Sequence, residues 1–496
     1  MKPRSLLSLA LALVLLLTAG LAQAQQVFQF TTHDIKLEIL PPQVFEARFG
    51  DNPDVPRTEK AILALAEQLY GRKEPTQDAK GEECGEYEVG LLFAALQNPE
   101  VSDHTRRQVD YIMAAALPTA SWKTYTSGYF KFFYVDNDPY ANHNVTLAEV
   151  QATATAMNYG WNKYVNAGFQ VPKHYLTPTG AKRIDVKIYY ISSTTLGQTD
   201  STWNHIELNS KSCVKDSCKR KTTSNHELFH RVQYTSGYVT GTANMKWIVE
   251  GSASWSQKFT YASIRDYMDR MNSGLQYPDK NLITTRSYDN CHFWVYMDEL
   301  FNPAESGAAL KEVWNKYSTN GKNAKAAVAW VASTYLGLPT FDNYVIKWTR
   351  ANYCKDFTNA SATWKHDYTE DETTTTQCSV THGPLSHAPK VAAGTISSNS
   401  TVITKSGAVA PYGADNYEFT VGAAVTTVKI FCDGADTGDF AWQFIPIKAS
   451  QVKTYSYTTT REYTHTRSFA AGAYDKYGVI VMGRSKGGSY TLRVGP

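Results

Sequence analysis

The chain lacks a strong charge of either sign, and it lacks any long apolar run beyond its first residues. Its 49 Lys and Arg nearly balance its 46 Asp and Glu, which leaves a formal net charge of +3 over 496 residues. A balance this close to zero favours neither nucleic acid nor an anionic surface as a partner. No stretch after residue 17 approaches the length of a membrane span, so no transmembrane segment is expected.

The first 24 residues have the pattern of a signal peptide. Lys2 and Arg4 supply the charged start, residues 6–17 the apolar stretch, and A-Q-A at 22–24 the cleavage pattern. Because the apolar stretch is too short to span a membrane, we expect cleavage before Gln25 and a secreted or periplasmic protein. The remaining length suits two or three domains.

Seven cysteines are an odd number for a secreted chain, so we expect disulfides and one thiol left over. Cys213 and Cys218 have four residues between them in a polar, basic loop and are expected to form a small bridge. Cys354 and Cys378 flank a polar stretch and are expected to close it. The cysteines that the sequence does not pair are Cys84, Cys291 and Cys432.

The most informative motif is H-E-x-x-H at residues 226–230. Residues four apart share a helix face, so His226 and His230 can bind one metal ion, and Glu227 lies near enough to take a proton from a water molecule there. A catalytic zinc usually takes three protein ligands and leaves a fourth position for water. Glu250 is the candidate for the third ligand, because a carboxylate set among apolar side chains is costly to bury without a partner.

A competing interpretation treats Ser224 to Glu227 as a helix capping box, with Ser224 as the cap and Glu227 reaching back to it. The segment around Glu250, twenty positions after His230, favours the metal site.

Residues 226–230 together with Glu250 resemble the gluzincin metallopeptidases, which include thermolysin-like and membrane-alanyl aminopeptidase-like branches. W-I-V-E-G-S-A at 247–253 is similar to the W-x-x-E-G-x-A of the aminopeptidase branch, and residues 127 to about 301 resemble a group of secreted bacterial gluzincins. The resemblance implies an α+β fold with a zincin-like, two-lobed peptidase domain. It also implies one catalytic zinc ion and a catalytic role for Glu227.

Tyr288 extends the resemblance. In aminopeptidase-like gluzincins a tyrosine that opens a helix of the form Y-E-K-G-x-x-x-F-x-Y-L stabilises the oxyanion, and Tyr288 stands at that place in residues 288–297. Its phenol can donate a hydrogen bond to developing negative charge. Two alternatives stay open: Tyr288 only caps a helix in a chain with 32 tyrosines, or His292 takes the role.

The chain departs from these families at two places. Thermolysin-like enzymes have an aspartate four residues after the glutamate ligand, where this chain has Ser254, so the groups that orient the ligands are unassigned. The G-A-M-E-N-type segment that holds a free amino terminus is also missing. Residues 203–209 alternate as a strand and are expected to be the edge strand onto which a peptide adds, which favours an endopeptidase.

Residues 25–120 are charge-rich and carry amphipathic runs at 58–69, 86–96 and 106–116, which predict helices. This region is either a fixed N-terminal domain or a propeptide. As a propeptide it would offer Cys84 as a zinc ligand in a latent form, whereas a disulfide is the alternative for this cysteine.

Residues 121–380 are expected to form the peptidase domain. A strand at 129–135, a capped helix from Thr146, a strand at 184–190 and an active-site helix at 223–234 follow in the order of a zincin N-terminal subdomain. Further helices of the same domain are predicted at 288–300, 308–317, 324–335 and 340–353.

Residues 390–496 turn to short alternating segments, which predict a β-sandwich. The end of this region looks like the C-terminal accessory domains of secreted bacterial peptidases, with a surface or a polysaccharide as the partner. Asp433, Asp436 and Asp439 lie in one turn and either bind calcium or belong to a polar hairpin.

The sequence therefore predicts a secreted zinc metallopeptidase that acts on proteins or peptides as an endopeptidase. One alternative is a secreted adhesin or glycan-binding protein with a vestigial zinc site, and another is an aminopeptidase. The presence of Glu227 between two histidines argues against a vestigial site, since a decayed site has no chemical need for a base.

Overall fold

The structure is a computed structural model, and it describes residues 27–30, 35–71, 86–172, 183–203, 205–302, 304, 306–355, 374–377, 380–398 and 402–496. The predicted signal peptide, Cys84 and Cys378 lie outside these residues. The chain divides into two compact units, and the division passes through helices α6 and α7. The first unit is Met1–Asn158, His174–Glu227 and Val239–Ala243, and the second is Tyr159–Lys173, Leu228–Tyr238 and Asn244–Pro496.

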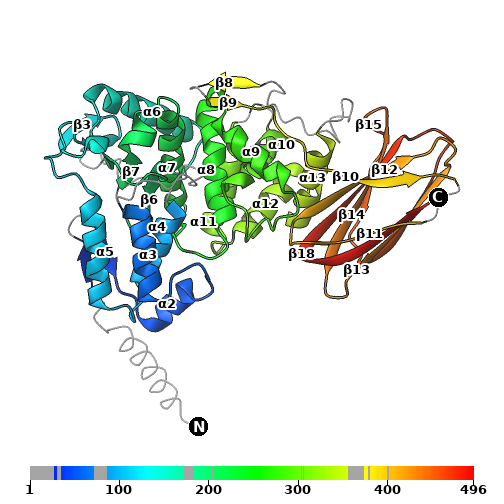
Figure 1. The fold of residues 1–496 in the computed structure, drawn as a ribbon, viewed down its shortest axis with the longest axis horizontal. Coiled ribbons are helices and arrows are strands. Elements are labelled where there is room, and N and C mark those ends of the chain that lie inside the picture. Colours follow the sequence, from blue (N-terminus) through cyan, green and yellow to red (C-terminus); the bar gives the residue numbers. More distant parts are fainter. Residues whose placement is uncertain are drawn as a thin grey trace, which may run out of the picture. The chain divides into compact units, whose positions relative to one another are not determined.

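The first unit begins with a hairpin and a helical layer (Figure 1). Its elements are β1 (Val27–Phe30), β2 (Ile35–Glu38), α2 (Pro42–Phe49), α3 (Glu59–Tyr70), α4 (Glu86–Leu96) and α5 (Asp103–Ala116). Thr58 and Ser102 begin α3 and α5 by accepting hydrogen bonds from backbone amides in the first turn. The helices lie where the amphipathic runs predict them, and their apolar faces share one core with Trp203.

A five-stranded sheet follows in the same unit, in the order β3-β4-β5-β7-β6. Its strands are β3 (Lys123–Ser127), β4 (Phe130–Tyr134), β5 (Ile184–Tyr189), β6 (Gly197–Thr199) and β7 (His205–Asn209). β4, β5 and β7 run parallel, whereas β3 and β6 are antiparallel to their neighbours.

The prediction that residues 203–209 form the edge strand is wrong, because β7 lies between β5 and β6. All of β7 is buried, including its polar residues. Gln198 of β6 donates from Nε2 to Oε2 of Glu207 at 2.6 Å, and Nε2 of His205 lies 3.2 Å from Oε1 of the same carboxylate. The polar residues of β7 thus contact other protein groups, and β6 is the outer strand.

Helices α6 (Leu147–Asn166) and α7 (Lys219–Thr235) pack near this sheet. The predicted capping box opens α6: the backbone amide of Thr146 donates to Glu149 Oε2 at 2.7 Å, and the amide of Glu149 donates to Thr146 Oγ1 at 3.3 Å. α7 begins earlier than predicted, because Oδ1 of Asp216 accepts from the backbone amides of Cys218 and Lys219. The short helices η1 (Ala141–His143) and η3 (Ser210–Val214) complete the connections.

The second unit adds a helical half after α7. Its elements are α8 (Lys246–Tyr261), η4 (Ala262–Ile264), α9 (Asp266–Gln276), η5 (Tyr288–Asn290), α10 (Cys291–Phe301), α11 (Ala308–Thr319), α12 (Ala324–Leu336) and α13 (Phe341–Cys354). Aromatic rings fill its core: Trp247 stacks on Trp294 at 5.5 Å between centroids and meets Phe293 and Phe341 edge on. These four aromatic residues are therefore packing residues.

The C-terminal region is rich in strands and encloses a core of its own, which with the helices gives the α+β class that the sequence predicts (Figure 1). A hairpin of β8 (Thr375–Gln377) and β9 (Val380–His382) precedes it. Its strands are β10 (Val391–Ile396), β11 (Ile403–Val409), β12 (Ala414–Val421), β13 (Thr427–Gly434), β14 (Asp439–Lys448), β15 (Gln451–Val452), β16 (Ser456–Thr458), β17 (Glu462–Ser468) and β18 (Lys476–Gly495).

One strand, β18, belongs to both layers of the sandwich. Its first half pairs with β12 and β14, and its second half pairs with β11 and β13. The change occurs at Gly487 and Gly488, whose positive φ angles of 65° and 141° suit glycine. The sequence analysis expects only short segments in this region, whereas β18 is a single strand over Lys476–Gly495.

The sandwich packs directly on the helical half of the second unit. Arg484 lies 2.8 Å from Asp342 of α13, Gln443 donates to Thr349 at 2.8 Å, and the backbone amide of Ala414 donates to the carbonyl of Pro278 at 2.8 Å. These contacts fix the sandwich within its unit.

Both predicted disulfides are wrong, because Cys213 and Cys354 are free, buried thiols. Burial raises the pKa of the Cys213 thiol well above its usual value, and its Sγ lies near the carbonyl of Lys219. Cys218 is disulfide-bonded, but to a cysteine other than Cys213. Cys213 is a buried residue of η3, which the spacing of the two cysteines does not reveal.

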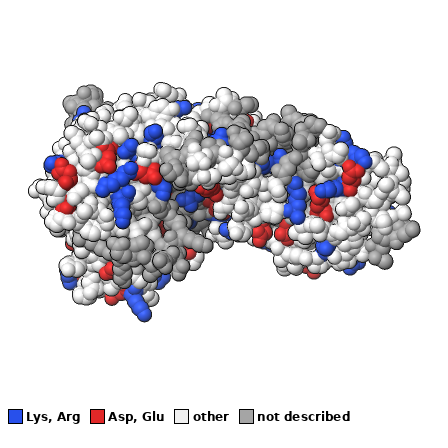
Figure 2. Space-filling model, turned by 45° about the horizontal axis from the view of Figure 1, so that its top comes forward, with Lys and Arg blue, Asp and Glu red and all other residues white. Residues whose placement is uncertain are grey.

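Figure 2 shows one face of the molecule, on which Lys and Arg lie interspersed with Asp and Glu. A mixed surface agrees with the nearly balanced charge of the chain. Within the described residues, no helix combines the length and apolar character that crossing a membrane requires.

Substitution of Arg106 tests how much this side chain stabilises the N-terminal helices. It is buried on α5 and donates to the carbonyls of Leu96, Val101 and Asn98 at 3.1, 2.5 and 2.6 Å. Arg106→Met leaves these carbonyls without their donor and should lower the free energy of unfolding by about 2 to 4 kcal/mol in urea titrations. The neighbouring Arg107→Met, at an exposed position, is the control and should change it little. Equal stability of the two variants would show that Arg106 does not support this layer.

Candidate metal centre

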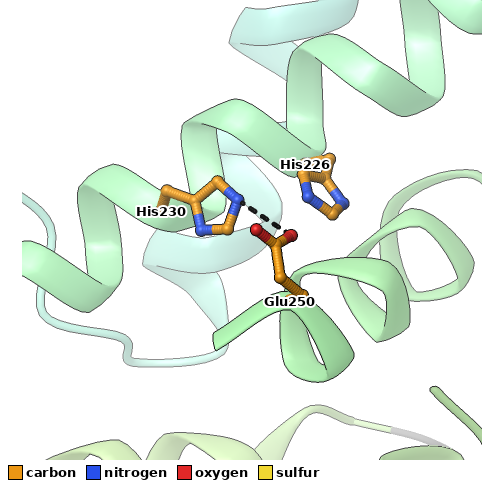
Figure 3. Close-up of side chains that lie close together, drawn as sticks. All are labelled: His226, His230 and Glu250. Carbon is orange, nitrogen blue, oxygen red and sulfur yellow. Dashed lines mark ion pairs between the residues drawn. The ribbon is translucent and has the colours of Figure 1, made fainter. Parts of the chain in front are cut away.

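His226, His230 and Glu250 lie together. Each offers one ligand atom, these atoms all lie within 4.8 Å of one another, and all three residues are buried. Nε2 of His230 lies 3.6 Å from Oε2 of Glu250. Figure 3 shows the two imidazoles of α7 and the carboxylate of α8 turned toward one another.

Local structure explains this arrangement. His226 and His230 are four residues apart on one continuous helix, so their rings leave the same face of α7. The chain then turns back through residues 236–245, where Gly237 and Gly241 adopt positive φ angles of 86° and 78°. This turn leads into α8, which carries Glu250 in its second turn.

The donor set fits a divalent cation. Two imidazoles and one carboxylate are the ligand types of catalytic zinc sites. Glu250 is fully buried, and a carboxylate removed from water requires a cation or several hydrogen bonds to offset its lost hydration. The group is therefore able to hold a metal ion.

Glu227 lies on α7 between the two histidines and is fully buried. Its side chain lies against Gly197 of the outer strand β6. A Cβ atom at position 197 would come within 2.9 Å of Cγ and 3.2 Å of Oε1 of Glu227. The absence of a side chain at Gly197 is thus what allows this carboxylate to lie beside β6.

Buried polar side chains of β6 and β7 contact one another. Glu207, which accepts from Gln198, is fully buried. Burial, and then this carboxylate, raises the pKa of the Tyr189 phenol well above its usual value. The contact between Gln198 and Glu207 also links the side chains of β6 and β7, and this holds the strand that borders Glu227.

The sequence leaves the groups that would orient the candidate ligands unassigned, and the structure places one side chain against the ring of His230. Oε1 of Gln233 lies 2.8 Å from Nδ1 of His230. The sequence could have indicated this contact, because Gln233 follows His230 by three residues and such residues share a helix face. Ser254, at the position of the aspartate in thermolysin-like enzymes, is a buried residue of α8.

Tyr288 lies in η5, which packs on α8 beside Glu250. Asn290 of η5 donates to the carbonyl of Trp247 at 3.1 Å, and a Cβ at Gly251 would meet Asn290 Cβ at 3.1 Å. Tyr288 is almost fully buried, and the guanidinium of Arg270 lies 4.9 Å from its ring centre. Gly251, which follows Glu250, therefore permits η5 with Tyr288 to approach α8 closely.

His292, the alternative to Tyr288, points into the core of the second unit. Its Nδ1 lies 2.8 Å from the carbonyl of Asp289, and its ring packs on Trp348 with 4.9 Å between centroids. Burial, and then the charge of Arg286, lowers its pKa well below the usual value. These contacts are those of a packed core histidine.

Comparison with known proteins assigns no family. No family model matches the chain, and no curated protein matches it. The pre-peptidase C-terminal domain of a collagenase from Bacillus anthracis is 17% identical, covering 22% of this chain and 99% of that chain at a TM-score of 0.17. A structure of the M60 catalytic domain with the CBM51-1 and CBM51-2 domains from Clostridium perfringens ZmpB is 9% identical, covering 79% of this chain and 62% of that chain at a TM-score of 0.26. PliG from Aeromonas hydrophila, a periplasmic inhibitor of g-type lysozyme, is 12% identical, covering 21% of this chain and 97% of that chain at a TM-score of 0.16.

The ion pairs of Asp436 and Asp439 favour a polar hairpin over a calcium site at this turn. Asp436 lies 2.6 Å from Arg461, and Asp439 lies 2.9 Å from Arg484. Among the described residues, the cluster of His226, His230 and Glu250 is the one group of His, Cys, Asp or Glu side chains close enough to share an ion.

Substitution of Glu250 tests directly whether this group binds zinc. The full-length chain should bind one zinc ion, and Glu250→Ala should weaken binding by more than about 100-fold, the upper end of the loss seen for groups that only orient a ligand. Competition of the zinc-free protein with a chelator measures this affinity. Glu67→Ala, at an exposed position of α3, is the control and should bind zinc as tightly as the unaltered chain. Equal affinity in Glu250→Ala would exclude Glu250 as a ligand.

Proposed function

We propose that this chain is a secreted zinc metallopeptidase that hydrolyses peptide bonds in proteins or peptides. The observation that carries the proposal is the buried group of His226, His230 and Glu250, with Glu227 one residue after the first histidine on the same helix. Two imidazoles, one carboxylate ligand and a separate carboxylate base are the side chains that zinc-assisted hydrolysis requires.

The residues of the site would have separate roles in catalysis. His226, His230 and Glu250 would hold the ion. A zinc ion, when bound, lowers the pKa of a water molecule and polarises the carbonyl of the scissile bond. Glu227 would accept the proton of the attacking water and later donate it to the leaving amine. Tyr288 would donate a hydrogen bond to the developing oxyanion.

An endopeptidase suits this chain better than an aminopeptidase. Gly197 of the outer strand lies against Glu227, so an extended peptide added along β6 would pass the base with residues on both sides of the scissile bond. The sequence also lacks the segment with which aminopeptidases hold a free amine. The same site therefore supports cleavage within a chain.

The remaining parts of the proposal rest on sequence. Residues 1–24 would direct secretion, residues 25–120 would be the N-terminal region, residues 121–380 the peptidase domain, and residues 390–496 the accessory sandwich with a surface or polysaccharide as its partner.

Casein clearance with and without a chelator, beside an aminoacyl-anilide assay, tests the proposal. Chelator-sensitive clearance of casein supports an endopeptidase. Hydrolysis of the anilide alone identifies an aminopeptidase, and inactivity in both assays with zinc bound supports a binding protein with a vestigial site.

Glu227→Gln and His230→Ala separate the base from the ligands. Glu227→Gln retains the shape of the side chain but not its basicity, so it should keep zinc and lose turnover by at least about 100-fold. His230→Ala should lose both. Metal analysis of each purified variant beside the casein assay provides the two readouts. A fully active Glu227→Gln variant would refute the assignment of roles.

Gly197→Ala tests the contact between β6 and the base. The added methyl group would come within 2.9 Å of Glu227 Cγ, so the carboxylate must move. Displacement of a reacting group by about 1 Å can cost about 100-fold in rate, so turnover should fall by that order while zinc content stays unchanged. Gly383→Ala, where the structure leaves open space around the new methyl group, is the control. Normal turnover in Gly197→Ala would show that Glu227 does not depend on β6.

A further inference from the structure

Gln233 lies three residues after His230 on α7, and its side chain is fully buried. Its Oε1 lies 2.8 Å from Nδ1 of His230, and its Nε2 donates to the carbonyl of Val249 at 2.9 Å and to Oγ of Ser252 at 3.1 Å. One amide therefore contacts a ligand residue of α7 and residues on both sides of Glu250 on α8.

The carbonyl of Val249 decides which way this amide points. A carbonyl oxygen only accepts hydrogen bonds, so the amide nitrogen must face Val249 and the amide oxygen must face His230. Nδ1 of His230 then carries the proton, and in a neutral imidazole this leaves the lone pair on Nε2. Nε2 is the atom that lies 3.6 Å from Oε2 of Glu250. In this tautomer the lone pair of His230 is on Nε2, the ring atom beside Glu250.

Ser252 holds the same amide from a second side. Its Oγ also accepts a hydrogen bond from Nε1 of Trp314 at 3.3 Å, and Trp314 is buried on α11. A chain of contacts thus runs from α11 through α8 to the imidazole on α7. Every member is buried, so packing limits the rotamers that each side chain can adopt.

We infer that Gln233 is a positioning residue of the metal centre, which holds His230 in the Nδ1–H tautomer and fixes α7 against α8 beside Glu250. The inference rests on the proposed function, because it assigns Gln233 a part in zinc binding. A metal-binding histidine usually donates its other ring N–H to a carboxylate, a carbonyl or water. Here a side-chain amide of the same helix accepts that bond.

The test compares two substitutions at this position in the full-length, zinc-free protein. Gln233→Met keeps the volume of the side chain but removes the amide, and zinc affinity measured against a chelator should fall by about 10- to 100-fold. Gln233→Glu keeps an acceptor for Nδ1–H and should recover most of that affinity. Thr235→Ala, whose lost hydroxyl donates within α7 to the carbonyl of Arg231, is the control and should bind zinc normally.

Histidine-selective ¹⁵N NMR of the zinc-free proteins provides a second readout that a purely structural role would not change. His230, identified by its loss in His230→Ala, should be the Nδ1–H tautomer in the unaltered chain and in Gln233→Glu, and a mixture in Gln233→Met.

The outcomes separate this inference from the proposed function. An unaltered chain that binds zinc, beside a Gln233→Met variant that binds it equally well, would overturn the inference and leave the proposed function intact. Equal weakening in both Gln233 variants with an unchanged tautomer would reduce Gln233 to a structural residue and overturn it as well. Failure of the unaltered chain to bind zinc would refute the proposed function, and the tautomer signal would still decide whether Gln233 orients His230.

Discussion

A buried carboxylate beside two buried imidazoles is the constraint on which the rest of the candidate site depends. Glu250 is fully removed from water, and a charge in that position is costly unless a cation or hydrogen bonds offset the lost hydration. The chain nevertheless builds several close contacts that keep it there. Gly251 admits η5 and α10 against α8, and Gln233 joins α8 to the histidine of α7. The donor atoms of this group fit a metal ion.

The polar interior of the first unit follows the same principle. Glu207 and Gln198 contact each other between β7 and β6, where the sequence pattern suggests a strand half exposed to water. Their contact holds the outer strand that borders Glu227 through Gly197. The N-terminal helices share a core with Trp203, which precedes β7, so that layer is packed on the sheet it precedes in the sequence.

Sequence reasoning succeeded where a local pattern carries the information. The spacing of His226 and His230, and the capping box at Thr146, are local, and both appear in the structure. It failed where the surrounding packing, and not a local pattern, decides the outcome. The polar residues of β7 are buried with the contacts of Glu207, Cys213 is a free thiol buried in η3, and β18 continues through a glycine pair that normally marks an end. Gln233 is intermediate, since its spacing was visible but its acceptors on α8 were not.

A crystal of the full-length protein grown with zinc tests the central claim most directly, by anomalous diffraction measured on both sides of the zinc absorption edge. The account predicts one ion bound jointly by His226, His230 and Glu250, with Nε2 as the ligand atom of His230. A difference map in which these side chains turn away from one another, or in which zinc binds only elsewhere on the chain, would contradict it.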